Sequence, residues 1–156
     1  MNETKVTEEY LSLFPTRLHN ILKIERNRRK FINNVCDEFD DVVVYRGLHR
    51  ADLIHEDDFI GNLDEAELYG RSNRKETIEM CAVSVNEDKQ QIITALSIPN
   101  QNRPALGIAK GLMKAEYGPA DFKEVEGVKK THHNWYLFED KIKDVVMEFT
   151  LVNIDE

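Results

Sequence analysis

The stretch that decides the fold is VVVYRG at residues 42–47. Three β-branched residues followed by a tyrosine favour an extended backbone, because such side chains pack well on a pleated surface. The run is short and apolar, so we predict a buried strand over 42–45 that ends at Arg46 and Gly47.

The segment before this strand has a helical pattern. Proline suits the first turn of a helix, so we expect one helix from Pro15 to about Phe39. Glu25, Arg28 and Arg29 interrupt its apolar stripe, which indicates a section whose polar face meets water or a partner. The apolar residues recur at spacings of three, four and seven and include Phe14, Leu18, Ile21, Leu22, Ile32, Val35 and Phe39.

The segment after the strand loses its periodicity. Residues 48–76 contain acidic residues, two glycines and isolated apolar residues, with one plausible helical turn at 64–68. Connections longer than about 12 to 15 residues are usually functional or mobile. We therefore expect a long acidic loop or insert over 48–76.

The next segment has the pattern of a β-hairpin. Residues 77–85 and 91–98 are two extended runs, and the polar stretch at 86–89 separates them as a turn would. The prolines at 99 and 104 end this pattern.

A helix and three strands are expected in the last third of the chain. Apolar residues from 105 to 117 stand at helical spacing, and a glycine followed by a proline at 118–119 ends the helix. Gly107 and Gly111 in that helix would permit close packing on a sheet, with Lys110 facing solvent. Strands are expected over 122–125, 133–138 and 145–152.

Together these elements predict an α+β fold. We expect a mostly antiparallel sheet of about five or six strands, with two main helices packed on one side. The sequence contains no internal repeat, low-complexity tract or Pro/Ser-rich linker. We therefore predict a single domain over 1–156.

The net charge of −8 is unevenly distributed over the 156 residues. Residues 16–30 carry a local charge of +5, whereas residues 37–68 hold eleven acids against two arginines, a local −9. Binding to nucleic acid needs a clustered positive face, and only the 17–30 segment offers one, so direct nucleic-acid binding is not expected. We interpret the basic 17–30 segment as a partner for the acidic 37–68 segment within the same chain.

The sequence also bears on location and redox state. It contains no apolar run of about 20 residues, and its first residues are polar and acidic, so we expect a cytoplasmic protein that does not enter a membrane. Cys36 and Cys81 lie far apart and outside any CxxC pair. We expect both to be reduced core thiols rather than a disulfide or a metal site.

The first candidate site follows the predicted strand. Tyr45, Arg46 and His49 stand together, with Gly47 allowing close approach of the backbone. An arginine offers a planar fork of donors that suits a phosphate or another planar anion. The alternative is that Arg46 pairs with one of the nearby acids.

The order of three residues resembles that of ADP-ribosyltransferases. Arg46 in an aromatic-Arg-Gly triplet, Ser84 and Glu148 follow the order of that family. The resemblance implies that Arg46 holds the phosphates of NAD, Ser84 supports the nicotinamide ribose and Glu148 promotes loss of nicotinamide. Only Ser84 stands where the family has Ser-Thr-Ser, and Val146 occupies the position of a second Glu or Gln.

The second candidate site is the run THHNWY at 131–136. In a strand, His132 and Tyr136 would share one face, while His133 and Trp135 would share the other. His132 is a candidate acid or base, alone or with His49. Trp135 and Tyr136 are candidates for stacking a base, and the alternative is that Trp135 anchors the core.

No cofactor or metal motif is complete in this sequence. The acidic runs lack the spacing of an EF-hand, and the phosphate-binding glycine loops and the HExxH motif are absent. We therefore expect no metal and no cofactor, with NAD required only under the ADP-ribosyltransferase resemblance.

Two functions from different classes remain open. The leading hypothesis is a small acidic binding or inhibitor module that captures a protein partner with a basic surface or a small nucleotide-like ligand. The rival is an enzyme that uses NAD through Arg46, Ser84 and Glu148, although we favour a role without catalysis. A third option is a structural subunit whose helix at 15–39 docks a second copy.

Overall fold

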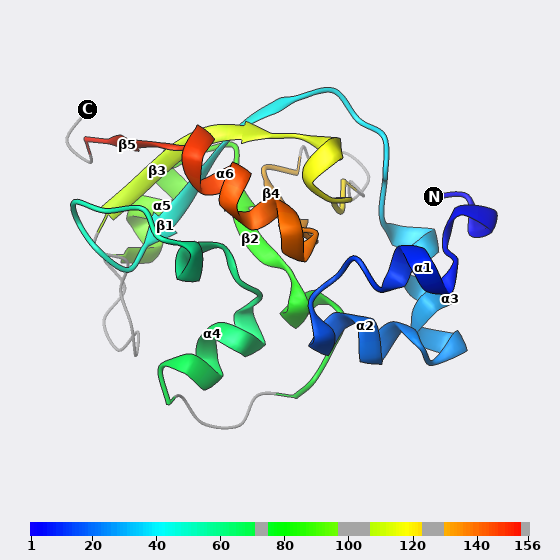
Figure 1. Cartoon of the computed structure of the whole chain (residues 1–156). Coiled ribbons are helices and arrows are strands. Elements are labelled where there is room, and N and C mark those ends of the chain that lie inside the picture. The colour runs from blue at the N-terminus through cyan, green and yellow to red at the C-terminus, as the bar shows by residue number, and fades with distance from the viewer. Residues whose placement is uncertain (71–74, 97–106, 123–129, 154–156) are drawn as a thin grey trace.

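The computed structural model describes residues 1–70, 75–96, 107–122 and 130–153. Its centre is a single five-stranded sheet with the order β4-β2-β1-β3-β5, in which every neighbouring pair is antiparallel (Figure 1). The α+β fold expected from the sequence is therefore confirmed. The strands are β1 (Val42–Leu48), β2 (Val83–Asn86), β3 (Gly107–Met113), β4 (His132–Trp135) and β5 (Thr150–Val152).

The predicted strand at 42–45 is the middle strand of this sheet. It continues through Arg46 and Gly47 to Leu48, and all of it pairs with β3, from Val42 opposite Met113 to Leu48 opposite Gly107. Its pairing with β2 is brief, with Tyr45 opposite Asn86. The β-branched residues of β1 are thus all paired with β3, in the extended conformation that their propensity favours.

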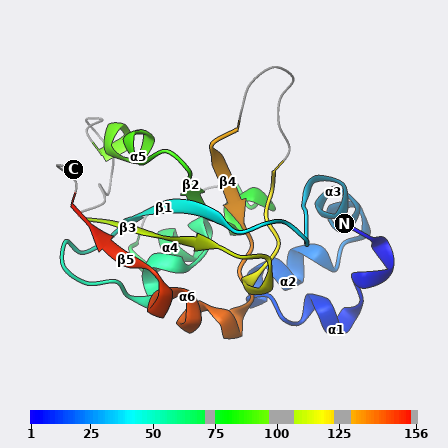
Figure 2. The same ribbon diagram turned by 90° about the horizontal axis from the view of Figure 1, so that it is seen from above.

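The described residues form six α-helices, where the sequence predicted two main ones. Figure 2 shows α5 and α6 on opposite sides of the sheet. The helices are α1 (Glu8–Leu11), α2 (Thr16–Leu22), α3 (Glu25–Asn34), α4 (Asn62–Leu68), α5 (Lys89–Leu96) and α6 (Ile142–Glu148). Single 3₁₀ turns occur at η1 (Glu3–Lys5), η2 (Glu56–Phe59), η3 (Glu79–Cys81), η4 (Ala115–Tyr117) and η5 (Glu139–Lys141).

The single helix predicted over 15–39 was wrong. The chain bends at Ile24, which has extended backbone angles, so that α2 and α3 pack against each other. Asn27 and Arg28 donate from α3 to the carbonyls of Ile21 and Leu22 at the end of α2. The polar residues that interrupt the apolar stripe therefore bond to the end of one helix rather than continue it.

The predicted hairpin of 77–85 and 91–98 was also wrong. Only its first run contains a strand, β2, and the second run begins with α5. The Asp88 carboxylate accepts from the backbone N–H of Gln90 at the start of α5, as N-terminal capping residues do. The polar stretch at 86–89 thus begins a helix instead of a turn. Residues 97–106, including the prolines at 99 and 104, lie outside the described residues.

Residues 107–113 form β3, not the predicted helix. The apolar residues of GIAKGLM fit the 3.6-residue period of a helix as well as the 2-residue period of a strand. The segment is a strand because it pairs along the whole of β1. Gly111 permits close packing as a strand residue and not, as expected, as a helix residue, because a Cβ there would lie 2.3 Å from the Phe149 ring.

The end of the chain is helix and strand rather than a meander. The predicted strand at 145–152 divides at Phe149 into α6 and β5, because Ile142, Val145 and Phe149 together face the core. The predicted strand at 133–138 corresponds to β4, which ends at Trp135. Most of the strand expected over 122–125 lies outside the described residues.

The buried apolar residues form two clusters. The larger one lies between the inner face of the sheet and α6, and it contains Val44, Leu48, Phe59, Trp135 and Phe149. The smaller one joins α1, α2 and α3 to Ala82 and Tyr136. Among the described residues, no helix is long and apolar enough to cross a membrane.

The acidic segment 48–76 is packed against the rest of the molecule where it is described. Its helical turn at 64–68 is confirmed as part of α4, and Phe59 is fully buried. Arg17 of α2 pairs with Asp64 and Glu67 of α4. Arg17 is thus paired with the acidic segment as expected, whereas Arg29 pairs with Glu25 and Lys30 pairs with Glu79, outside that segment. Cys36 and Cys81 are both free, but Cys36 is exposed, so the expectation of a core thiol was wrong for Cys36.

Candidate functional site

Arg46 lies on the inner face of the sheet, between Val44 and Leu48 in the alternation of β1. Its guanidinium is buried, and its Nε and Nη1 donate to the carbonyls of Asp58 at 2.7 Å and Ser84 at 2.9 Å. Its Nη2 donates to Glu65 at 3.1 Å. Burial lowers the pKa of Arg46, and the nearby carboxylates oppose that effect. A ligand on Arg46 would have to displace these internal acceptors.

His49 joins Arg46 in the same interior, and we name Arg46, His49, Asp58 and Glu65 the buried polar cluster. The Asp58 carboxylate is fully buried and accepts from the backbone N–H groups of His49 at 2.7 Å and His55 at 2.8 Å. The His49 Nε2 atom lies 3.6 Å from Glu65. These contacts connect the end of β1 to η2 and α4, so the cluster anchors the acidic segment to the sheet.

The outer face of the sheet carries a second polar region. Residues directly opposite each other on paired antiparallel strands present their side chains on the same face. The register therefore aligns one row of polar residues across all five strands, which we name the polar row. It consists of His132 (β4), Asn86 (β2), Tyr45 (β1), Lys110 (β3) and Thr150 (β5).

Ser84 and Asn134 extend the polar row along β2 and β4. These two residues are opposite each other, and Ser84 reaches diagonally to His132, with 2.6 Å between Oγ and Nε2. Burial, with help from Lys130 and His133, lowers the pKa of His132. The lowered pKa favours the neutral imidazole, which can form this hydrogen bond with Ser84 in either tautomer.

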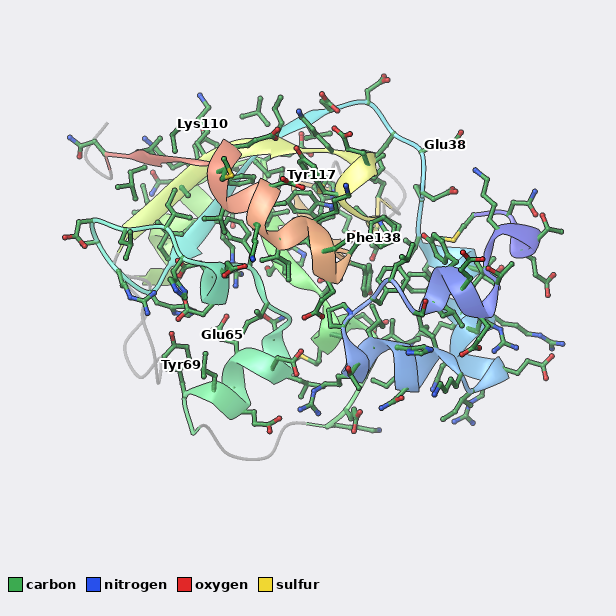
Figure 3. The ribbon with its side chains drawn as sticks, in the orientation of Figure 1. Glu38, Glu65, Tyr69, Lys110, Tyr117 and Phe138 are labelled. Carbon is green, nitrogen blue, oxygen red and sulfur yellow. The ribbon has the colours of Figure 1, made fainter. Side chains whose placement is uncertain are left out.

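Lys110 is the cation of the polar row. Its ammonium lies 5.9 Å from the centre of the Tyr45 ring, and its side chain is exposed. Figure 3 places Lys110 on the opposite side of the sheet from Glu65 and Tyr69. Within the described parts of the chain, no carboxylate pairs with Lys110. Because the Lys110 ammonium faces solvent and has no such pair, its charge is available to an anion.

An open groove of about 500 Å³ lies beside Lys110. Lys110 and Thr150 line it together with Val43, Leu112, Lys114 and Glu148. Glu148 is at the end of α6, not in the strand that was predicted for it. It accepts from the Tyr117 hydroxyl at 2.5 Å and pairs with Lys114 at 3.4 Å. These contacts hold Glu148 at the rim of the groove.

The two aromatic candidates in the second sequence cluster are part of the core. Trp135 is fully buried and donates from Nε1 to the Gly118 carbonyl at 3.1 Å. Tyr136 follows β4 and packs edge to face on Phe31, with 5.0 Å between ring centres. In this conformation neither ring is available to stack a ligand on the outer face, so the alternative of a core anchor fits Trp135.

The structure thus divides the candidates from the sequence into three groups. Tyr45, Ser84 and His132 come together on the outer face, while Arg46 and His49 lie in the interior below it. Glu148 stands at the rim of the groove. Asn86 and Thr150 were missed as candidates, Asn134 was included only as a member of the run at 131–136, and Lys110 was expected only to face solvent. Lys110 is the one charged residue of GIAKGLM, and that charge within an otherwise uncharged segment was the signal for it.

Fold and site together define an α+β protein with a polar outer sheet face beside a groove. Comparisons with known protein families, curated proteins and solved structures found no match. The residues themselves must therefore indicate the function.

Proposed function

We propose that the protein is a binding module for a small anionic, nucleotide-like ligand, held on the polar row and in the groove beside it. The observation that carries this proposal is Lys110, an exposed cation without a carboxylate partner in the described part of the chain. It lies in a continuous row of hydrogen-bonding side chains. Anions bind where such charges stand beside oriented polar groups.

The residues around Lys110 suit the parts of a nucleotide. Its ammonium would bind the phosphate, and Thr150 offers a hydroxyl beside it. Asn86 and Asn134 carry amides that both donate and accept, which suits the edge of a heterocycle. Three strand spacings separate β3 from β4, about 14 Å in all. That span fits an extended nucleotide better than a single phosphate ion.

A protein partner with a basic surface is less well supported than a small ligand. Much of the acidic segment that would attract such a partner is paired inside the chain. Arg17 contacts Asp64 and Glu67, while Lys5 contacts Asp37 and Glu38. Paired carboxylates exert a weaker field on an approaching surface than free ones. Of the two kinds of partner in the binding hypothesis, we therefore favour the small ligand over the protein. We propose that the protein binds it in the cytoplasm.

The alternative of an enzyme that uses NAD shares part of this site. Ser84 and Glu148 stand on the outer face and at the groove rim, but Arg46 faces the interior. In that alternative Lys110, rather than Arg46, would hold the phosphates. The neutral His132 beside Ser84 would act as the base. Release of nicotinamide from NAD would support this alternative, and binding of NAD without release would support the binding module.

The proposal is tested by measuring ligand-dependent stability. Thermal unfolding is followed with AMP, ADP, NAD and inorganic phosphate, each at millimolar concentration. A ligand at 100 times its dissociation constant adds about 2.7 kcal/mol to the free energy of unfolding. For a chain of this size that corresponds to an increase in melting temperature of several degrees, at about 2–4 °C per kcal/mol.

Matched lysine variants locate the site. Lys110→Gln should weaken nucleotide binding about tenfold, the effect of one charge-assisted hydrogen bond. Lys143→Gln makes the same charge change on the exposed surface of α6 and should leave binding unchanged. Failure of every nucleotide to raise the melting temperature, or equal losses in both variants, would contradict the proposal.

A further inference from the structure

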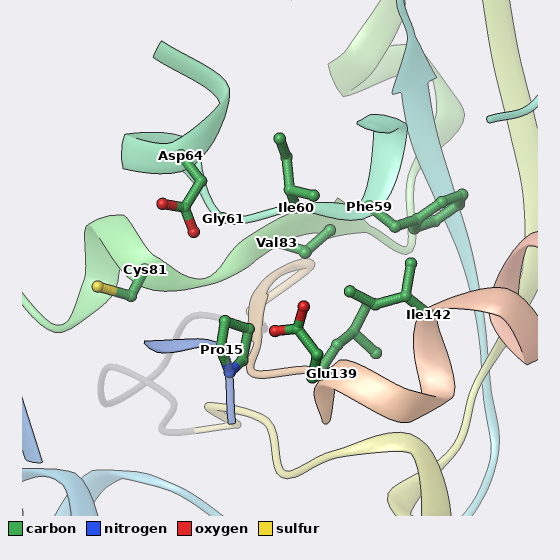
Figure 4. A pocket seen from close by; sticks show the side chains of 10 residues that line it. Pro15, Phe59, Ile60, Gly61, Asp64, Cys81, Val83, Glu139 and Ile142 are labelled. Carbon is green, nitrogen blue, oxygen red and sulfur yellow. The ribbon is translucent and has the colours of Figure 1, made fainter. Parts of the chain in front are cut away.

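A second cavity lies away from the polar row, on the inner side of the sheet. Its volume is about 190 Å³, and it is enclosed by the start of α2, the chain at 59–61, the beginning of β2 and the segment at 137–142 (Figure 4). Most of its wall is apolar and comes from Phe59, Ile60, Val83, Leu137 and Ile142. Pockets for drug-sized ligands have volumes of about 300–1,000 Å³, so this cavity suits a smaller molecule. It is too small for a nucleotide.

Two carboxylates meet this apolar space. In Figure 4 Asp64 and Glu139 extend towards the cavity from opposite sides. The Glu139 backbone N–H donates to the Leu13 carbonyl at 2.9 Å, which positions the residue. Its side chain is exposed, and no cation among the described residues pairs with it. Glu139 therefore offers a charge that the fold itself does not neutralise.

The surroundings of the cavity are net negative. Asp64 accepts from Arg17 at 2.8 Å, but the same guanidinium also contacts Glu67. The single positive charge of Arg17 is thus shared by two carboxylates, and Glu139 contributes a third negative charge. The Cys81 thiol in the wall experiences the same field. Burial raises its pKa to about 12, and Asp64 adds to that increase. Cys81 is therefore a protonated wall residue and not a nucleophile.

We propose that this cavity binds an alkylammonium group, a primary amine on a short apolar chain. The ammonium would lie between the carboxylates of Asp64 and Glu139, and its chain would lie along Phe59, Val83 and Ile142. Charged groups at the mouth and an apolar wall behind them are the arrangement that a cation with a hydrocarbon stem requires. A metal ion is a poorer fit, because the described residues contain no group of three metal-ligating side chains.

The experiment uses n-pentylamine hydrochloride, a primary amine on a short apolar chain. Binding to the full chain is followed by chemical shift changes in ¹⁵N-resolved NMR spectra, with n-pentanol as the probe of the same shape without charge. The amine should shift resonances of residues around the cavity, and the alcohol should bind about tenfold more weakly. Equal binding of amine and alcohol would overturn the proposal.

Two glutamate variants test the charge. Glu139→Gln should weaken amine binding about five- to tenfold, because it removes the carboxylate that lacks a partner cation. Glu9→Gln changes the same charge on the exposed surface of α1 and should leave binding unchanged. Unchanged amine binding in Glu139→Gln would overturn the proposal, whether or not the polar row binds nucleotides.

A blocked lysine distinguishes the two sources of an alkylammonium. Nα-acetyl-lysine-N-methylamide carries the same ammonium and stem on a peptide backbone. If it binds as well as pentylamine, the cavity accepts the lysine side chain of a protein. Binding of pentylamine alone identifies a free amine as the ligand. Failure of both probes would exclude an alkylammonium site.

Discussion

Tyr45 and Arg46 are neighbours in the chain but belong to two contrasting polar regions. Tyr45 stands in the polar row on the outer face, where Lys110 and His132 are exposed. Arg46 stands in the buried polar cluster, where every donor that it uses has an acceptor in the chain. The two regions have similar residue types, and they differ in their exposure to water: the buried one is bonded within the chain, and the exposed one is where we propose that a ligand binds.

The physical basis of this contrast is desolvation. A buried charge must find partners inside the protein, because the loss of water costs several kcal/mol for each ion. An exposed charge keeps its water and can exchange it for a ligand at little cost to the fold. Variants in the interior should therefore change stability, whereas variants on the outer face should change binding or titration.

The largest effect on stability is expected from Arg46→Met. It would remove the cation that contacts Glu65 at 3.1 Å and the donors to the Asp58 and Ser84 carbonyls. We expect a loss of about 3–5 kcal/mol in the free energy of unfolding, measured by urea denaturation. Adding Glu65→Gln to this variant should recover part of the loss, because it removes the negative charge that Arg46 offset. A loss below about 1 kcal/mol for Arg46→Met would contradict the structural role.

A somewhat smaller effect is expected at Asp58. Asp58→Ala leaves the backbone N–H groups of His49 and His55 without their acceptor in a buried site. The expected loss is about 2–4 kcal/mol in urea denaturation. Asp58→Asn keeps one acceptor oxygen and should lose about half as much. Equal losses in the two variants would show that the acceptor oxygen is not what stabilises this turn.

An acid-dependent effect is expected at Asp57. Hydrogen bonds from Arg50 lower the pKa of Asp57 from 3.8 to about 2. The carboxylate therefore stabilises the fold above pH 4, and this contribution is lost as the pH falls towards 2. Asp57→Asn should cost about 1 kcal/mol at pH 7 because the pair is partly exposed to solvent.

Urea denaturation at several pH values tests the Asp57 prediction. The difference between wild type and Asp57→Asn should close as the pH falls from 4 to 2. Asp52→Asn, at an exposed position of the same loop, provides the matched comparison and should have little effect at either pH. A difference for Asp57→Asn that persists at pH 2 would contradict the pairing with Arg50.

The smallest effect on stability is expected on the outer face. NMR titration of His132 should give a pKa below 6.5, and Lys130→Gln should move that pKa towards 6.5 by removing a neighbouring positive charge. Stability should fall slightly below pH 6.5, where the unfolded chain binds a proton that the folded chain resists. Lys143→Gln should not move the titration, and neither variant should change stability by more than about 0.5 kcal/mol. A pKa of His132 above 6.5 would contradict its place beside Lys130 and His133.

Some elements could be predicted from local sequence because one pattern dominates there. The β-branched run at 42–44 has no competing helical pattern, and its strand is present. The alternation at 132–135 is also observed, with His133 and Trp135 buried and His132 and Asn134 turned outward. In both segments the propensity of the residues and their burial favour the same structure.

Other elements could not be predicted because two patterns compete in them. GIAKGLM at 107–113 suits a helix or a strand, and the open edge of β1 decides for the strand. VVMEFTLV at 145–152 contains a helix end and a short strand, because Phe149 turns its ring under Gly111. Both outcomes depend on contacts with residues that are distant in sequence. The periodicity of a single sequence carries no information about such contacts.

The sequence by itself determined the α+β class, the central strand and the polar residues that follow it. It also indicated that basic and acidic segments would pair, as Arg17 and Asp64 do. Only the tertiary structure decided that Arg46 faces inward while Tyr45, Ser84 and His132 face outward beside Lys110. The physical reason is that a strand sends successive side chains to opposite faces, and only packing decides which face is buried.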